Sequence, residues 1–180
     1  MIKYFVNQLR KEHIGERIFA DNAEMHPGHI YRYQFEAKYC KSKDKVLDIG
    51  CGVGYGSEII SCNKNVSYIG VDKISPATKY REFGTFVSNV DIMRFKPIFS
   101  YDIAISFETL EHMLFPSKLI RLLKKSKQLI IFSTPTQPTK HFNTHHLHDF
   151  PVNQIINMFE PWKLIHIENQ PEEMSHIFVF

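Results

Sequence analysis

The sequence is poor in cysteine and has no long apolar run. Its three cysteines, Cys40, Cys51 and Cys62, are odd in number and form no C-x-x-C pair, which argues against a disulfide framework and a structural zinc site. Unpaired thiols suit a reducing compartment, so we expect a cytoplasmic protein. No stretch approaches the roughly 20 apolar residues that a membrane span needs, and the first residues lack the apolar core of a signal peptide.

Charge of one sign is also scarce. The formal net charge is only +3, and the one basic run, from Lys118 to Lys127, alternates with leucine and isoleucine as an amphipathic helix would. This pattern argues against a nucleic-acid surface. The chain has no repeats or low-complexity stretches, and its 180 residues with 43% hydrophobic content fit one compact domain.

A glycine-rich loop follows an apolar run, in the stretch VLDIGCGVGYG from Val46 to Gly56. The run predicts a strand, and Gly50, Gly52 and Gly54 allow the backbone to come close to a ligand where a Cβ would clash. The spacing lacks the third glycine of G-x-G-x-x-G, which argues against a dinucleotide and an NAD(P)-dependent oxidoreductase. It points instead to S-adenosylmethionine, with Asp48 placed to bind the α-ammonium group.

Polar residues also end the next two predicted strands. Asp72 closes the strand from Val66, about 20 residues after the glycine loop, where a carboxylate can accept both ribose hydroxyls of a nucleoside. A third strand over residues 84–87 is followed by Asn89 and Asp91, and either side chain could hold the exocyclic amine of adenine. Parallel strands place all these ends at one edge of the sheet.

Later elements follow from the same apolar patterns. We expect a short helical beginning before Pro27 and helices over residues 30–39 and 152–159. Strands are expected over residues 101–107, 128–133, 162–168 and 174–180. The last two strands form an antiparallel hairpin at the sheet edge.

At this point the chain resembles the class I S-adenosylmethionine-dependent methyltransferases. The segments VLDIGCGVGYGS, YIGVD, YDIAISFETLEHM and IIFSTP occur in the expected order, and the resemblance runs from about Gly15 to the end. Within that superfamily, the chain resembles small methyltransferases found with glycosyltransferases. Their patterns GER, H-x-x-RY, GYGS, SFETxEH, STP and H-x-x-EF are matched here by residues 15–17, 29–33, 54–57, 106–112, 133–135 and, as HLHDF, 146–150. Asn89 departs from the aspartate of many relatives.

The resemblance implies an α/β, Rossmann-like fold with a seven-stranded, mostly parallel sheet, an antiparallel last strand and helices on both faces. It implies a single methyltransferase domain over 1–180, with an N-terminal helical lid (1–44), a cofactor-binding core (45–133), and an acceptor loop with the C-terminal hairpin (134–180). Arg32 and Tyr33 would then reach the methionine carboxylate, and Phe107 would contact the cofactor. Without the resemblance, Arg32 would be taken as exposed and Tyr33 as packed.

A cluster of acids and histidines lies after the fourth strand. Glu108, Glu111 and His112 share one face if they form the first turn of a helix, and His146 follows on a later loop at the same edge. Glutamates in a first turn also meet the helix dipole favourably, and a histidine there is often packed. As a set, the four side chains can ligate a divalent cation. The set resembles the metal sites of ubiquinone-pathway and small-RNA O-methyltransferases, which implies Mg²⁺ or Mn²⁺.

Two catalytic schemes follow. A cation would lower the pKa of a bound hydroxyl, with Glu111 among its ligands. Without a metal, His146 or His112 would act as a general base oriented by the glutamates. The predicted function is O-methylation of a hydroxyl on a sugar or glycan intermediate. The alternatives are a quinone-type phenol, an RNA 2′-hydroxyl, which the weak basic charge disfavours, and a non-catalytic S-adenosylmethionine-binding partner protein.

Overall fold

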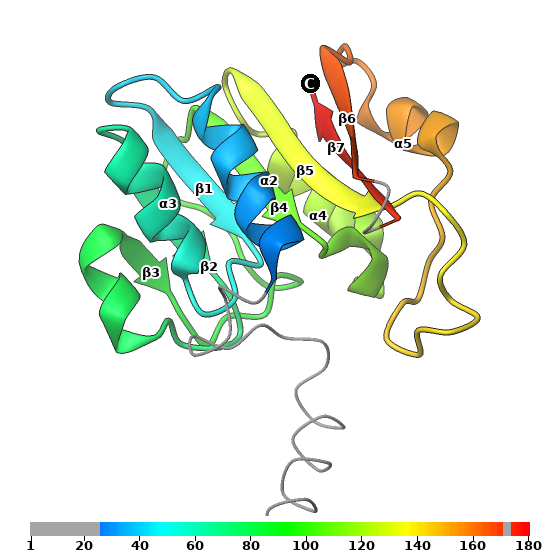
Figure 1. Ribbon diagram of the computed structural model, residues 1–180, viewed down its shortest axis with the longest axis horizontal. Coiled ribbons are helices and arrows are strands. Elements are labelled where there is room, and N and C mark those ends of the chain that lie inside the picture. Colours follow the sequence, from blue (N-terminus) through cyan, green and yellow to red (C-terminus); the bar gives the residue numbers. More distant parts are fainter. Residues whose placement is uncertain (1–25, 171–173) are drawn as a thin grey trace, which may run out of the picture.

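The computed structural model describes residues 26–170 and 174–180, and the expected helical beginning and the Gly15-Glu16-Arg17 motif lie outside them. Within the described residues one sheet contains seven strands, in the order β3-β2-β1-β4-β5-β7-β6 (Figure 1). The strands are β1 (Lys45–Ile49), β2 (Ser67–Val71), β3 (Thr85–Val87), β4 (Ile103–Phe107), β5 (Leu129–Pro135), β6 (His166–Gln170) and β7 (Ser175–Val179).

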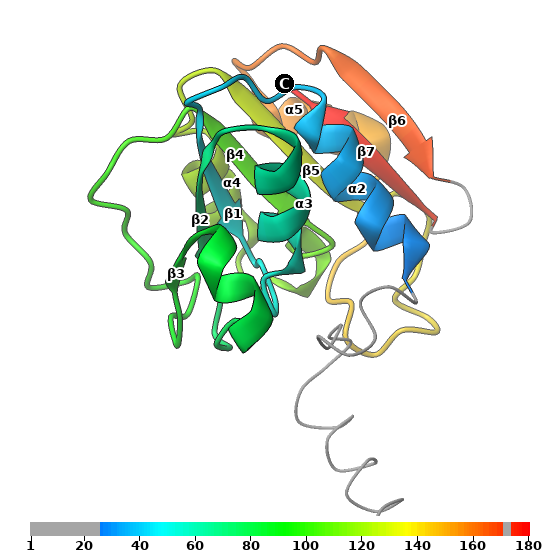
Figure 2. The ribbon, with the colours of Figure 1, turned by 60° about the vertical axis from the view of Figure 1, so that its left-hand side comes forward.

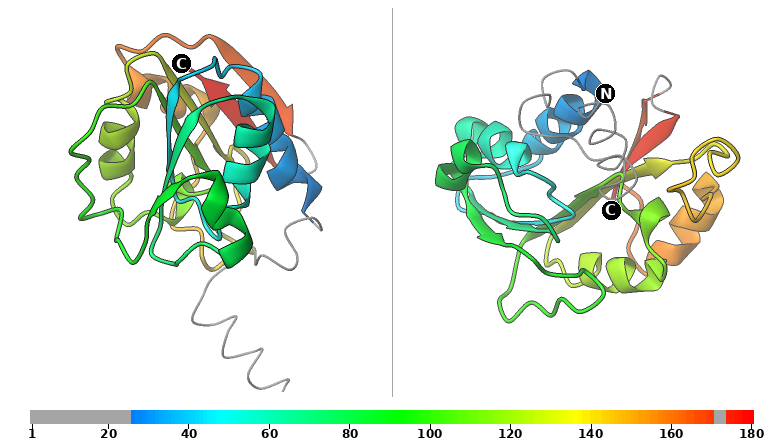
Figure 3. Two further views of the ribbon diagram at one scale, coloured as in Figure 1. Left: turned by 90° about the vertical axis from the view of Figure 1, so that its left-hand side faces the viewer. Right: turned by 90° about the horizontal axis from the view of Figure 1, so that it is seen from below.

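Helices cover both faces of this sheet. They are α2 (Pro27–Ala37), α3 (Tyr55–Asn63), α4 (Pro116–Leu123) and α5 (Val152–Phe159), with short 3₁₀ helices η2 (Thr78–Phe83) and η3 (Leu110–His112). Figure 2 and the right-hand view of Figure 3 show α2 and α3 on one face, with α4 and α5 on the other. The predicted Rossmann-like layering is confirmed.

The strand pairing sets the position of the ligand edge. β1 is parallel to both β2 and β4, β4 is parallel to β5, and β7 is antiparallel to β5 and β6. The chain therefore moves outward from β1 through β2 to β3 and then returns to β4 on the other side of β1. The connections after β1 and β4 diverge at this switch point, and they leave a crevice beyond the carboxyl ends of the two strands.

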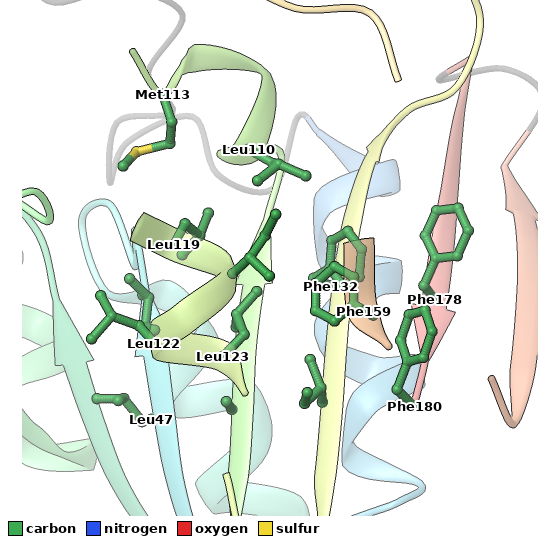
Figure 4. Packing of buried hydrophobic residues seen from close by; sticks show 14 of the residues in the cluster. Leu47, Leu110, Met113, Leu119, Leu122, Leu123, Phe132, Phe159, Phe178 and Phe180 are labelled. Carbon is green, nitrogen blue, oxygen red and sulfur yellow. The ribbon is translucent and has the colours of Figure 1, made fainter. Parts of the chain in front are cut away.

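A group of stacked phenylalanines anchors the antiparallel end of the sheet. Phe132 of β5 stacks on Phe159 of α5 with ring centroids 4.6 Å apart, and Phe159 stacks on Phe180 at 4.7 Å (Figure 4). Phe178 extends the group, and all four rings are buried. Because this burial removes large apolar areas from water, it fixes β7 between β5 and β6.

A buried carboxylic acid lies on α2, at the face of the sheet opposite to α5. Glu36 of α2 is fully buried, Cys40 Sγ donates to its Oε1 at 2.8 Å, and its Oε2 has no hydrogen-bond partner. Burial raises the pKa of Glu36 to about 8. The folded protein therefore keeps this proton at neutral pH.

This raised pKa predicts a pH-dependent loss of stability. Between the ordinary pKa of 4.5 and about 8, the unfolded chain releases the Glu36 proton while the folded protein retains it. Stability therefore falls as pH rises, by up to roughly 4 kcal/mol across that window. We expect Glu36→Gln to flatten this dependence in urea unfolding at pH 5 and pH 8. Glu58→Gln, at an exposed position on α3, is the matched control. Parallel curves for Glu36→Gln and wild type would contradict the assignment.

One element differs clearly from expectation. The strand predicted over residues 162–168 begins only at His166. Trp162 and Leu164 are partly buried against the core next to α5, so their apolar character serves packing of the connection rather than strand pairing.

No helix in the described part of the chain is long and apolar enough to cross a membrane.

Candidate active site

A cavity of about 560 Å³ lies at the carboxyl ends of β1, β2 and β4. Its walls come from the loops after these strands and after β3, from α2 and from the long loop after β5. The predicted cofactor residues that line it are Tyr33, Gly50, Gly52, Asp72, Asp91 and Phe107. Arg32, Asp48, Gly54 and Asn89 are not among the lining residues, and the structure gives each of them a different setting.

The glycine loop contains three glycines with positive φ angles, and at one of them it leaves space for a ligand. Gly50, Gly52 and Gly54 all have positive φ angles, of 87°, 57° and 92°. A Cβ at Gly50 would lie 2.6 Å from Thr109 Oγ1, and one at Gly54 would lie 2.9 Å from the Phe86 ring. At Gly52 it would meet nothing within 4 Å, so this glycine leaves space on the side where a ligand can approach.

Two carboxylates approach the cavity beyond this loop. Asp72 accepts bonds from the amides of Gly52 at 2.9 Å and Ile74 at 3.0 Å, which fixes its carboxylate at the end of β2. Asp91 accepts from the Met93 amide at 2.9 Å. Asn89 has a positive φ of 59° and an exposed side chain. Of the two open candidates for the adenine amine, the structure therefore places Asp91 in the cavity wall.

Asp48 is buried beneath the loop rather than exposed to the cavity. Tyr33 Oη donates to its Oδ2 at 2.8 Å, and Tyr68 Oη donates to the same oxygen. Burial raises the pKa of Asp48 to about 7, although the two hydroxyls oppose that shift. The Tyr33 ring does line the cavity, edge-on to Phe107 with centroids 4.9 Å apart. Asp48 thus orients Tyr33 through Oδ2, while its Oδ1 is buried without a hydrogen-bond partner, and its contact with the α-ammonium group stays a prediction.

Arg32 is fully buried, so its interpretation as an exposed side chain is wrong. Its Nε donates to Gln170 Oε1 at 2.8 Å, and a terminal nitrogen lies 3.4 Å from Glu108 Oε1. Glu108 lines the cavity, so this ion pair connects Arg32 to the cavity wall. A buried guanidinium paired with a carboxylate fixes α2 against the ends of β4 and β6.

Glu108 does not lie on a helix. It has a φ of 46°, and η3 begins only at Leu110, so the prediction of a shared helix face for Glu108, Glu111 and His112 is wrong. The Glu108 carboxylate accepts from Ser133 Oγ at 2.6 Å and from Ser175 Oγ at 2.9 Å. These bonds occupy both of its oxygens.

The structure does bring three of the four predicted metal ligands together. One carboxylate oxygen of Glu111 and one ring nitrogen each of His112 and His146 lie within 4.8 Å of one another. Thr134 Oγ1 donates to Glu111 Oε2 at 3.0 Å, while Oε1 is buried and has no hydrogen-bond partner. Burial, reinforced by the charge of Glu108, raises the pKa of Glu111 well above its ordinary value.

Hydrogen bonds orient both histidine rings of this cluster. The His145 carbonyl oxygen can only accept, so His112 donates to it from Nδ1 at 3.0 Å, which leaves Nε2 as the acceptor in the neutral ring. His112 Nε2 lies 3.8 Å from Glu111 Oε1. His146 Nδ1 lies 2.6 Å from Thr139 Oγ1, which is 3.4 Å from an Asp149 carboxylate oxygen. His112 Nε2 therefore faces the cluster as an acceptor.

Thr139 is buried behind His146, and this arrangement gives a testable role for its hydroxyl. We expect Thr139→Val to weaken Mn²⁺ binding by roughly tenfold or more, as loss of an outer hydrogen bond to a ligand histidine typically does. Thr139→Ser retains the hydroxyl and should restore most of the affinity. Titration followed by Mn²⁺ electron paramagnetic resonance measures both variants, and equal affinity in Thr139→Val would contradict the role.

His29 lines the cavity and was given no role by the sequence analysis. Its Nδ1 lies 3.1 Å from Tyr55 Oη, and burial, with Arg32 nearby, lowers the pKa of the ring to about 3. The ring therefore stays neutral at physiological pH. Its position one helical turn before Arg32 and Tyr33 was the signal that could have identified it.

The switch-point cavity, the open glycine loop and the carboxylate after β2 define a class I methyltransferase fold. The chain matches the family described as "Methyltransferase domain" over residues 29–179. It therefore belongs to this family, and the resemblance to class I S-adenosylmethionine-dependent methyltransferases is confirmed.

Similar proteins agree with this assignment. Two Mycobacterium tuberculosis proteins named "Probable S-adenosylmethionine-dependent methyltransferase" are 28% identical over 118 residues, covering 62% of this chain and 42% of each relative. The chain thus spans less than half of their length. A chain of the complex containing the Haloferax volcanii Trm112 methyltransferase activator has a TM-score of 0.66 at 13% identity, with 89% and 93% of the two chains covered.

A third similarity bears on the fold. N-methyltransferase NodS from Bradyrhizobium japonicum, solved with S-adenosyl-L-homocysteine, has a TM-score of 0.61 at 13% identity and covers 93% of this chain and 89% of its own. At such low identity the similarity establishes the shared fold alone.

Proposed function

We propose that this protein transfers a methyl group from S-adenosylmethionine to a hydroxyl of a sugar or glycan intermediate, with assistance from a divalent cation. The observation that carries the proposal is the buried, unpartnered Oε1 of Glu111 beside the imidazoles of His112 and His146. His112 also lines the cavity beyond the glycine loop. The cluster is therefore adjacent to the space where an acceptor would meet the cofactor.

The cavity fits a nucleoside cofactor at its other end. Asp72 can accept both ribose hydroxyls, and Asp91 can accept from the adenine amine. Gly50 and Gly52 line the floor, and Gly54 supports it by allowing the loop to pack closely on Phe86. When bound, the cofactor supplies an electrophilic methyl group on a sulfonium. Tyr33, Phe107 and His29 wall off the region between α2 and β4, where they exclude water from the reacting atoms.

The donor set also fits a divalent cation. One carboxylate and two imidazoles suit Mn²⁺ better than Mg²⁺, because Mg²⁺ prefers oxygen ligands. A cation held there would lower the pKa of an acceptor hydroxyl. Glu111 would provide the negative charge, while the His145 carbonyl and Thr139 keep the two rings in place. Arg32 and the two serines hold Glu108 in the adjoining wall.

A metal-free scheme has its own supporting observation. The bond from His112 Nδ1 to the His145 carbonyl leaves Nε2 able to accept a proton from the acceptor hydroxyl. Methyl transfer is an in-line displacement, so most of the acceleration comes from holding the hydroxyl oxygen against the methyl carbon. This requirement is the same in both schemes.

The proposal is tested by binding and transfer measured together. S-adenosylmethionine should bind in calorimetry and NADH should not. Methyl transfer from labelled cofactor should then be found with a panel of methyl glycosides, supplied with and without Mn²⁺. Methyl transfer to phenols or to RNA 2′-hydroxyls, with none to the glycosides, would show that the acceptor is not a sugar. Cofactor binding without methyl transfer to glycosides, phenols or RNA would identify a non-catalytic binding protein.

The assignment of the domain regions belongs to this proposal. Within the predicted lid region, 1–44, α2 contributes His29 and Tyr33 to the cavity wall, which supports a lid role for this helix. The loop within 134–180 contributes His145 to the wall and His146 to the cluster, which supports its role at the acceptor end.

A further inference from the structure

Exposed apolar side chains gather around the acceptor end of the cavity. Seven large hydrophobic residues are exposed within residues 26–170 and 174–180, and four of them fall in two short segments beside the metal-ligand cluster. These four are Leu114, Phe115, Phe142 and Leu147, with exposed fractions of 67%, 58%, 58% and 42%. We call them the apolar rim. Scattered exposed hydrophobics are ordinary, but a concentration at the mouth of a site points to a ligand.

Three hydrogen bonds join the turn after β4, which leads into Leu114 and Phe115, to the loop after β5, which carries Phe142 and Leu147. The Leu147 amide donates to the Glu111 carbonyl at 2.8 Å, and His148 Nε2 donates to the Met113 carbonyl at 2.9 Å. The third is the bond from His112 to the His145 carbonyl. Residues 111–114 and 145–148 thus form one unit at the ligand edge, where the loop after β5 passes the turn after β4 (Figure 1).

The rim is continuous with the cavity. Leu114 and Met113 line the cavity immediately after His112, so its wall changes from polar to apolar at this point. An acceptor hydroxyl placed beside the cluster would direct the rest of its molecule outward across Leu114.

We infer that the acceptor is an amphiphile, in which an aliphatic chain is attached to the sugar that carries the methylated hydroxyl. The sugar lies beside the cluster and the chain lies across the apolar rim. Burying the chain against four otherwise exposed hydrophobic side chains removes apolar surface from water on both partners. This inference rests on the proposed function, because it names the class of acceptor for the same site.

The test compares acceptors that differ only in their chain. Methyl and octyl glycosides of each sugar in the panel are assayed at concentrations below that at which the octyl compound forms micelles. We expect the octyl glycoside of the accepted sugar to show at least a tenfold higher kcat/KM, arising mainly from a lower KM. The double variant Phe142→Ser, Leu147→Ser should reduce this ratio several-fold. Ile98→Ser removes a hydrophobic residue that is even more exposed, at 99%, on a segment outside the rim, and it should keep the ratio.

The outcomes distinguish a failure of the amphiphilic acceptor from a failure of the proposed function. Equal kcat/KM for the two glycosides, or a ratio that survives the double variant, overturns the amphiphile while the sugar methyltransferase stands. Transfer to phenols or RNA with none to either glycoside overturns the proposed function. If octyl glycosides bring no gain but anionic phospholipid vesicles do, the rim binds a membrane surface and the inference is wrong.

Discussion

Glu111→Gln is expected to abolish divalent-cation binding and to lower turnover by about a thousandfold, which corresponds to roughly 4 kcal/mol of transition-state stabilisation. The amide keeps the size of the side chain and can still bond to Thr134, so the fold should survive. What it loses is a carboxyl group that can ionise when a cation binds at Oε1, the buried atom that has no hydrogen-bond partner in the protein. Cofactor affinity should change little, because Glu111 does not line the cavity.

Three measurements decide this prediction. Mn²⁺ titration reports the ligand set directly, calorimetry with S-adenosylmethionine reports the cofactor site, and single-turnover transfer reports the chemical step. Glu108→Gln is the informative companion, because its carboxylate lies outside the cluster and is held by Ser133 and Ser175. It should retain cation affinity. Full turnover of the wild type with a chelator, and no gain on adding Mn²⁺, would contradict the cation and leave His112 as the general base.

The strand ends could be predicted from the sequence because they depend on local pattern. Apolar runs identified β1, β2, β4 and β5, and parallel strands must place their carboxyl ends at one edge. This geometry alone placed Gly50, Gly52 and Asp72 around one cavity. The distance between such residues along the chain did not matter, because the sheet itself brings them together.

Long-range partners set the surroundings of two predicted cofactor residues, whose contacts with the cofactor stay predictions. An acid at the end of a strand can face either the ligand or the core, and Asp48 faces the core because Tyr33 and Tyr68 approach it from other elements. Arg32 was expected at the ligand, yet Gln170 and Glu108 hold it inside the protein. Neither pairing follows from spacing, since each joins segments that meet only after the sheet has formed.

Glu108 lies off the predicted helix face for a local reason. An i, i+3, i+4 pattern brings three side chains together only if all of them are helical, and Glu108 still belongs to the turn that ends β4. Glu111 and His112 nevertheless meet His146, because the backbone bond from Leu147 to Glu111 attaches the long loop to η3. Three of the four predicted ligands therefore come together, while Glu108 lies outside the cluster.

Asp72→Ala is expected to weaken S-adenosylmethionine binding by about a hundredfold or more. Loss of two hydrogen bonds from ribose hydroxyls to a carboxylate costs roughly 1.5 to 3 kcal/mol each. The amide of Gly52 would also lose its acceptor, so part of the effect reaches the ligand through a looser glycine loop. Asp72→Asn keeps an acceptor for that amide and separates the two contributions.

The control for this prediction comes from the two candidates for the adenine contact. Asn89 is exposed outside the cavity, and Asp91 lies in its wall. Asn89→Ala should therefore leave calorimetric affinity unchanged, while Asp91→Ala should lower it by less than Asp72→Ala, because it removes one contact instead of two. Thermal unfolding of each variant without ligand checks that the fold is retained. Unchanged affinity in a folded Asp72→Ala protein would show that the ribose is held elsewhere, and a loss in Asn89→Ala equal to that in Asp91→Ala would show that the loop after β3 rearranges when the cofactor binds.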